Sequence, residues 1–181
     1  MEKILEQKSI GSELRSYIKD VPDFPKKGII FKDITPLFLD GVFFQRLIAH
    51  LTERYQNNKP DAIVSVEARG FLLGAPLACN LGVSLVPVRK KGKLPRKTRD
   101  VTYDLEYGQD TLSVHEEDLI SGQRVLIVDD VLATGGTVSG VVQLLDQLHV
   151  HVQELLFLIE LDFLKGRKML GQHPIYSLTK Y

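Results

Sequence analysis

The 181-residue sequence has no tryptophan and only one cysteine, Cys79. A single cysteine excludes a disulfide within the chain, and its apolar and small neighbours favour a buried, inert thiol in a reducing compartment. No apolar run reaches the roughly 18 residues of a membrane span, and the first residues lack the hydrophobic region of a signal peptide. We therefore expect a cytoplasmic protein with no membrane partner.

The chain also lacks an excess of charge of either sign, since 23 Lys and Arg balance 23 Asp and Glu. This balance argues against broad binding to nucleic acid, although local basic clusters remain compatible with it. Linkers and internal repeats are absent as well. The length suits one domain, residues 1–181, that buries a substantial core.

Predicted strands and helices alternate along most of the sequence. Hydrophobic patterns indicate strands at 62–66, 85–88, 125–128, 155–161 and 175–178, and helices at 11–19, 40–55, 70–81, 138–148 and 164–170. This order predicts an α/β fold with a mainly parallel, twisted sheet flanked by helices. In such folds ligands bind at the carboxyl ends of the strands.

Residues 125–137 combine a buried strand, two acids and a loop of small residues. Two adjacent carboxylates, Asp129 and Asp130, follow the apolar run 125–128, and Gly135 and Gly136 precede a helix. Backbone N–H groups of 134–137 can bind a phosphate at the helix N-terminus. The acids are too close to such an anion to bind it, so hydroxyl groups or a metal ion are their natural partners. The pattern favours a sugar phosphate ligand.

Two common phosphate-binding loops are excluded by the same residues. The P-loop of a kinase-like or nucleotidyl enzyme requires a lysine after its glycine, and no lysine follows Gly135 or Gly136. The Gly-x-Gly-x-x-Gly pattern of dinucleotide sites is also absent.

Basic residues follow two other strands of the predicted sheet. Arg69 stands beside Gly70, where a strand passes into a helix, and can offer a fork of donors to a diphosphate. Residues 89–99 include seven basic side chains, and Gly92 and Pro95 disfavour a helix there. A bound diphosphate would relieve the repulsion between these charges, whereas a solvated loop or a weak nucleic-acid patch is the alternative.

Residues 125–137 closely resemble the phosphoribosyl diphosphate (PRPP) motif of type I phosphoribosyltransferases. Four further segments resemble the adenine phosphoribosyltransferase family in order and spacing, and the resemblance extends from about residue 12 to 178. These segments are 21–36, 67–71, 89–95 and 103–108. The resemblance implies an N-terminal hood at about 12–38, a flexible hairpin lid at about 90–116, and a cis peptide between Glu67 and Ala68.

The resemblance implies transfer of the phosphoribosyl group from PRPP to adenine, giving AMP and pyrophosphate, with Mg²⁺ bound through PRPP. Ile30, Phe31, Lys32 and Val131 are the implied adenine-binding residues, although Phe31 is equally compatible with a core position. Glu106 on the lid is the candidate to handle the proton on the imidazole side of the base, and the alternative is that Glu106 is a surface residue. The implied PRPP- and AMP-binding residues are Arg69, Arg89, Lys90, Lys93, Asp129, Asp130, Ala133, Thr134, Gly135, Gly136 and Thr137.

The family pattern also implies a homodimer in which Arg89 reaches the diphosphate of the neighbouring subunit. Asp129 and Asp130 are the expected catalytic carboxylates, because they can stabilise positive charge on the ribose. His115, beside two glutamates, is expected at the surface. The alternatives are a phosphoribosyltransferase for another base and a PRPP-sensing regulator, for which the short segment before the first predicted helix leaves no room for a DNA-binding module.

Overall fold

The computed structural model describes residues 9–104 and 109–181. Contacts divide the chain into a first unit that ends at Leu51 and a second unit, Thr52–Tyr181. Within the described residues, no helix is long and apolar enough to span a bilayer.

The first unit contains short elements around a two-stranded antiparallel sheet. Its elements are α1 (Ile10–Leu14), the 3₁₀ helix η1 (Arg15–Tyr17), β1 (Lys19–Pro22), β2 (Ile30–Asp33), the 3₁₀ helix η2 (Thr35–Leu39) and the start of α2 (Gly41–Tyr55). The predicted helix 11–19 is therefore too long, and the strand pair was not predicted. Asp40 caps α2 as expected, because its Oδ1 accepts from the Phe43 N–H at 2.9 Å.

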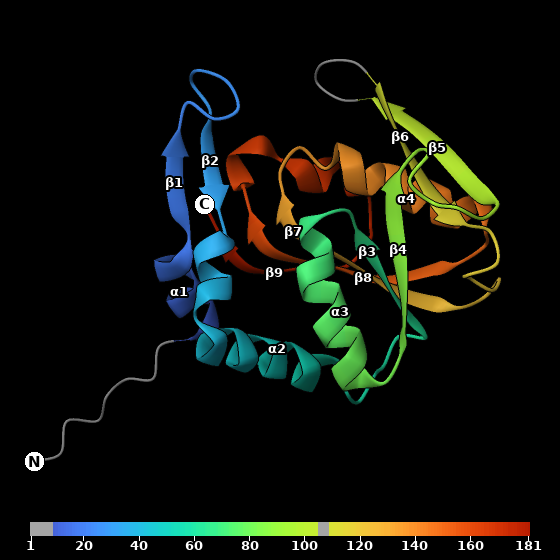
Figure 1. Cartoon of the computed structure of the whole chain (residues 1–181), viewed down its shortest axis with the longest axis horizontal. Helices are drawn as coiled ribbons and strands as arrows, with labels where there is room; N and C mark the ends of the chain where they lie inside the picture. The colour runs from blue at the N-terminus through green and yellow to red at the C-terminus, as the bar shows by residue number, and fades with distance from the viewer. Residues whose placement is uncertain (1–8, 105–108) are drawn as a thin grey trace, which may run out of the picture. The chain divides into compact units, whose positions relative to one another are not determined.

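The second unit contains a seven-stranded sheet in the order β5-β6-β4-β3-β7-β8-β9 (Figure 1). The strands are β3 (Ala62–Val66), β4 (Ser84–Lys90), β5 (Thr98–Asp104), β6 (Gln109–His115), β7 (Arg124–Leu132), β8 (His151–Glu160) and β9 (Ile175–Lys180). The run from β4 to β9 is parallel, whereas β6 and β5 are antiparallel additions. The predicted α/β class with a mainly parallel sheet is confirmed.

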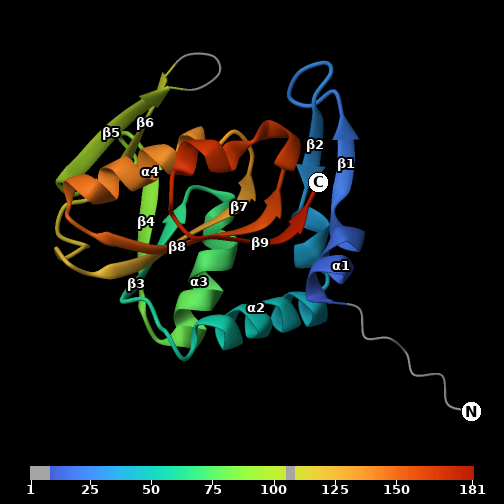
Figure 2. The same cartoon turned by 180° about the vertical axis from the view of Figure 1, so that it is seen from behind.

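Helices α3 (Arg69–Leu81) and α4 (Gly136–Gln147) lie on opposite faces of this sheet, as the two opposite views show (Figures 1 and 2). On β3, Ile63 and Ser65 face Gly74 of α3. The alternate residues Val64 and Val66 belong to the buried cluster that contains α4. Successive side chains of a strand point to opposite faces, so α3 and α4 cover opposite faces of the sheet. The predicted helix 164–170 is instead two 3₁₀ helices, η3 (Asp162–Leu164) and η4 (Gly166–Leu170).

Two expectations about single residues were wrong. Cys79 is exposed rather than buried, because it lies on the side of α3 that faces away from the sheet. His115 is buried, with 5% of its surface exposed, because it ends β6 and pairs with Thr98 of β5. Neighbouring residue types in the sequence did not reveal which face of each element is covered.

Candidate active site

The predicted site residues of the second unit gather at the carboxyl edge of its parallel strands. β3 ends at Val66 and β4 at Lys90, immediately before the Arg69 segment and the basic loop. β7 is longer than predicted and continues through Asp129 and Asp130 to Leu132. Its pairing with β3 stops at Val128, however, while its pairing with β8 continues. The two acids therefore lie where β7 has lost one neighbouring strand.

Arg69 and Asp130 form an ion pair at this edge, with 2.8 Å between Nε and Oδ2. The Asp130 side chain is 4% exposed, whereas Arg69 is 38% exposed. The Glu67–Ala68 peptide bond is cis, as predicted. Next to it, Gly70 packs so closely on β7 that a Cβ atom there would lie 2.7 Å from the Val128 carbonyl oxygen. The turn that carries Arg69 is thus seated directly on the strand that carries the acids.

The adjacent acids of β7 resist being charged together. Burial raises the pKa of the Asp129 carboxyl well above its usual range, and the charge of Asp130 raises it further. Burial also raises the pKa of Asp130, although the Arg69 guanidinium opposes this change. Hydrogen-bond donors or cations brought to such a pair lower the pKa and favour the charged forms. The pair is therefore suited to bind hydroxyl groups or a cation.

Glu67 gathers three of the predicted diphosphate-binding residues around its carboxylate. It accepts from Arg89 Nη2 at 3.0 Å, from Lys93 Nζ at 2.8 Å and from the Lys90 N–H at 3.2 Å. Burial acts to raise the pKa of Glu67, but these donors outweigh it and lower the pKa to about 2. Two side-chain cations and one backbone N–H therefore converge on a single carboxylate of the protein itself.

The whole basic segment 89–99 is matched by carboxylates. Each of its seven basic side chains lies within ion-pair distance of an acidic one. The pairs are Arg89 and Lys93 with Glu67, Lys90 with Asp110, Lys91 with Asp100, Arg96 with Asp118, and Lys97 and Arg99 with Glu116. Residues 91–97 form a loop between β4 and β5, as Gly92 and Pro95 predicted.

The predicted phosphate loop, Ala133–Thr137, joins β7 to α4. Gly135 has φ of 88° and precedes the first residue of α4, Gly136. This left-handed conformation favours glycine and turns the chain so that the helix N-terminus opens at the sheet edge. Tyr103 of the hairpin reaches the loop, with 3.5 Å between its hydroxyl and Thr137 Oγ1. A parallel edge, a helix N-terminus and two carboxylates thus occur together, as expected for a sugar phosphate site.

The residues proposed for the base fall in both units. Phe31 lies on β2, where Phe24 contacts it edge to face at 5.2 Å between ring centroids, and Ile30 is 56% exposed. The Lys32 ammonium pairs with Asp20 at 2.6 Å. Val131 is half-buried on β7 and pairs with Ile159 of β8. Glu106 lies outside the described residues.

Among the described residues, no three His, Cys, Asp or Glu side chains are grouped to hold a metal ion. The sequence placed Glu67 and Tyr103 in family segments but gave their side chains no role at the site, and it did not single out Glu160, Arg167 or Gly166. Glu160 carried a detectable signal, because it is the one charged residue at the end of an otherwise apolar strand segment, 155–161.

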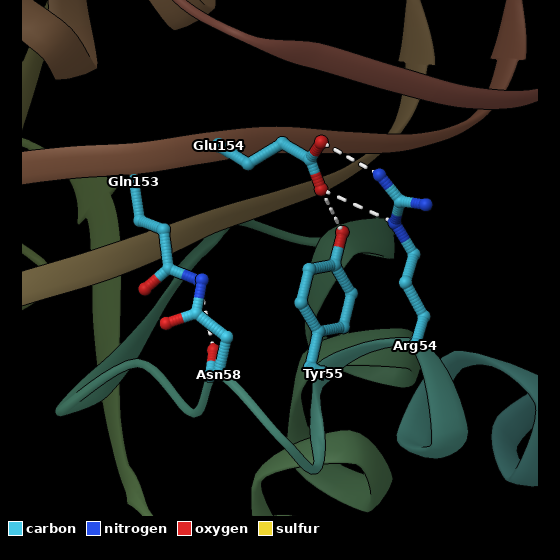
Figure 3. A pocket seen from close by; sticks show the side chains of 5 residues that line it. All are labelled: Arg54, Tyr55, Asn58, Gln153 and Glu154. Carbon is cyan, nitrogen blue, oxygen red and sulfur yellow. Dashed lines mark hydrogen bonds and ion pairs between the residues drawn. The ribbon is translucent and has the colours of Figure 1, made fainter.

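A polar hollow of about 240 Å³ lies away from these residues, at the amino ends of the strands (Figure 3). It is lined by Arg54, Tyr55, Asn58, Gln153 and Glu154. Arg54 and the Tyr55 hydroxyl both point to the Glu154 carboxylate, at 2.8 and 2.5 Å, and Arg54 stacks on another aromatic ring, 3.7 Å from its centroid. Its polar groups tie the end of α2 to β8.

Comparison with known proteins agrees with this geometry. A sequence model described as the phosphoribosyl transferase domain matches residues 39–160. Adenine phosphoribosyltransferases of Citrifermentans bemidjiense and Geotalea daltonii are each 53% identical over 169 residues, covering 93% of this chain and 99% of theirs. The chain therefore belongs to the phosphoribosyltransferase family, in its adenine phosphoribosyltransferase branch.

Solved structures of this branch share the fold. The adenine phosphoribosyltransferase of Thermoanaerobacter pseudethanolicus superimposes with a TM-score of 0.90 at 50% identity, over 94% of this chain and 99% of that one. The Saccharomyces cerevisiae enzyme, solved with adenine and an imino-altritol bisphosphate, gives a TM-score of 0.87 at 43% identity, over 93% and 98% of the two chains.

Proposed function

We propose that this protein transfers the 5-phosphoribosyl group of PRPP to adenine and releases AMP and pyrophosphate, a purine salvage reaction. The observation that carries the proposal is the complete PRPP motif at the carboxyl edge of the sheet, in a chain 53% identical to adenine phosphoribosyltransferases. A cytoplasmic location fits this role.

In this proposal the loop Ala133–Thr137 binds the 5-phosphate. Its backbone N–H groups at the start of α4 supply donors, and the Thr134 and Thr137 hydroxyls add two more. Asp129 and Asp130 accept hydrogen bonds from the ribose hydroxyls. These donors lower the raised pKa values of the pair, so that its charge is available to the ribose.

The chemical step builds positive charge on the ribose as the bond to the diphosphate breaks. Asp129 and Asp130 stabilise that charge through their carboxylates. Arg69, Lys90 and Lys93 stabilise the negative charge on the departing diphosphate of their own chain's site, and Arg89 stabilises that of the neighbouring subunit. For the three residues around Glu67, this requires them to exchange a carboxylate for a phosphate group.

Mg²⁺ enters the proposal through the substrate. Oxygen atoms of the diphosphate and ribose would hold the ion, and it would supply neutralisation of the negative charge on the leaving group. The chain's contribution fits this arrangement, since Asp129 and Asp130 supply oxygen atoms of the kind that Mg²⁺ prefers.

Adenine recognition is assigned to Ile30, Phe31, Lys32 and Val131. Phe31 and Val131 contact the two faces of the ring, the Ile30 carbonyl accepts from the exocyclic amine, and the Lys32 N–H donates to N1. Glu106 handles the proton on the imidazole side of the base. Hypoxanthine presents the opposite donor and acceptor to the Ile30 and Lys32 groups, which would leave buried polar atoms unpaired.

The test is to incubate the protein with PRPP, Mg²⁺ and, separately, adenine, hypoxanthine, guanine or orotate, and to measure the nucleotide formed. Sites that read a base through hydrogen bonds discriminate by roughly 10⁴-fold, so AMP is the expected product by that margin. Comparable turnover of hypoxanthine would refute the assignment of the base.

The proposal includes a homodimer in which Arg89 serves the partner's diphosphate. The support for this part of the proposal is the family pattern together with the symmetric dimers that are the commonest oligomers. Mixing the inactive variants Arg89→Ala and Asp130→Asn places both lesions in one site of a heterodimer and leaves the other intact. Recovered activity supports the shared site, whereas no recovery despite subunit exchange, confirmed by mass, assigns Arg89 to its own chain.

A further inference from the structure

Segment 162–170 lies against the proposed phosphate loop with backbone in direct contact. A Cβ atom at Gly166 would overlap the Ala133 carbonyl oxygen and lie 3.0 Å from Leu132 Cδ1. A Cβ atom at Gly135 would lie 2.6 Å from the Gly166 carbonyl oxygen. The two glycines therefore allow one backbone to pack on the other. Any shift of Gly166 toward the loop moves the loop itself.

An ion pair to a buried carboxylate fixes Arg167, the residue that follows Gly166. Arg167 donates from Nε to Glu160 Oε1 at 2.5 Å and from Nη2 to Oε2 at 2.7 Å. The Glu160 side chain is 3% exposed, and Lys180 Nζ lies 3.5 Å from the same carboxylate. The Arg167 hydrogen bonds are the main cause that lowers the pKa of Glu160, to about 2. The carboxylate is thus charged and forked to Arg167 at neutral pH.

Glu160 is also tied to the strand that leads into the loop. It ends β8 and lies opposite Leu132, the last residue of β7. The N–H of Leu161 donates to the Leu132 carbonyl at 2.9 Å. The loop is therefore held from two sides, by its own strand and by Gly166, and both supports meet at Glu160.

We propose that Glu160 and Arg167 are positioning residues that set the backbone of the loop Ala133–Thr137 and thereby the affinity for the 5-phosphate of PRPP. This inference rests on the proposed function. A phosphate site made of backbone N–H groups must be held to about 0.5 Å, and supporting residues outside the site usually provide that precision. The alternative is that the pair only fastens the C-terminal segment to the sheet.

The experiment compares Arg167→Lys, which keeps the charge but loses the fork, with the parent protein. KM for PRPP is expected to rise about 10- to 100-fold, the range found when residues that orient metal ligands are lost. KM for adenine is expected to stay within about twofold, because the pair does not touch the proposed base residues. Binding of ribose 5-phosphate should weaken by the same factor as PRPP, and binding of pyrophosphate should not.

The matched control is Lys165→Gln, which removes an exposed ion pair with Asp162 in the same segment, 2.7 Å long. It should leave both KM values unchanged. A second variant, Gly166→Ala, keeps the ion pair but pushes on Ala133, and it should raise KM for PRPP in the same direction. It therefore tests the inference even where Arg167→Lys does not fold.

A lower melting temperature of Arg167→Lys with unchanged KM for PRPP overturns the inference, since the pair would then serve only the fold. Equal loss of affinity for PRPP, adenine and pyrophosphate overturns it as well. The proposed function fails separately, if the parent protein forms no AMP, and ribose 5-phosphate binding still tests the loop in that case.

Discussion

Replacing Gly70 by alanine tests how tightly the Arg69 turn is seated on β7. The added Cβ would lie 2.7 Å from the Val128 carbonyl oxygen and 3.3 Å from Asp129 Oδ1. Non-bonded heavy atoms prefer about 3.5 Å, so the turn or the strand must yield by roughly 0.5 Å or more. The nearest of these atoms, the Val128 carbonyl oxygen, is backbone, which cannot rotate aside as a flexible side chain can.

Overpacking of this kind costs about 1–3 kcal/mol, and alanine returns up to about 1 kcal/mol through its higher helix propensity. A net loss of about 1–2 kcal/mol corresponds to a fall in melting temperature of about 2–8 °C for a protein of this size. Displacing a catalytic group by about 1 Å can cost 10²-fold in rate. A shift half as large predicts a loss of about 10-fold in kcat/KM on the same relation.

Thermal unfolding and steady-state kinetics with PRPP and adenine measure the two effects. Gly74→Ala is the matched control, because its Cβ would overlap the Ser65 side chain on β3 and meets no atom of β7 among its nearest neighbours. It should lower the melting temperature comparably and keep kcat/KM. Gly41→Ala, with no atom within 4 Å of its Cβ, should change neither. Parent-like stability and activity of Gly70→Ala would refute the reasoning, and so would an equal loss of activity in Gly74→Ala.

Asp130→Asn keeps the shape of the side chain but removes its charge, so steady-state assays should show kcat falling by about 10²-fold or more. The fall in kcat should exceed the rise in KM for PRPP. Unchanged kcat would assign the residue to substrate binding alone. The pKa of Glu160 lies at about 2, below its usual 4.5. Its contribution to stability is therefore complete above pH 4.5 and is lost as the pH falls toward 2. Between pH 4.5 and 2, the free energy of unfolding measured with urea should fall less in Glu160→Gln than in the parent. Tyr55→Phe removes the hydrogen bond to Glu154 and should lower the free energy of unfolding by about 1 kcal/mol, with kcat/KM preserved because the hollow lies away from the site; reduced kcat/KM would contradict that separation.

Elements with a strong local pattern were predictable from the sequence. The apolar run 62–66, the capped helix after Asp40 and the strand before Asp129 all carry their own periodic or capping signal, and each occurs in the structure. The pairing of β1 with β2 was missed, because Pro22 and Pro25 read as turn residues and each strand has only four residues. Such strands are set by tertiary contacts rather than by propensity.

The chemistry of the site was more predictable than its contacts. The motif placed Asp129, Asp130 and the glycines at the sheet edge, and sequence resemblance supplied the cis peptide at Glu67. The ion pair between Arg69 and Asp130 joins two strand ends that only the sheet order brings together. The Glu160–Arg167 pair likewise depends on how a 3₁₀ segment folds back, for which the sequence has no periodic signal.

The ion pairs of segment 89–99 weaken the long-range electrostatic field of this segment. Seven cations share five carboxylates, so the segment acts at long range as a set of dipoles with a small residual charge rather than as a strongly positive patch. Attraction of polyanions over several nanometres is correspondingly weak, and encounter with them should depend little on ionic strength. Selection among anions is then made at contact, by a ligand able to replace Glu67 at the donors that bind it.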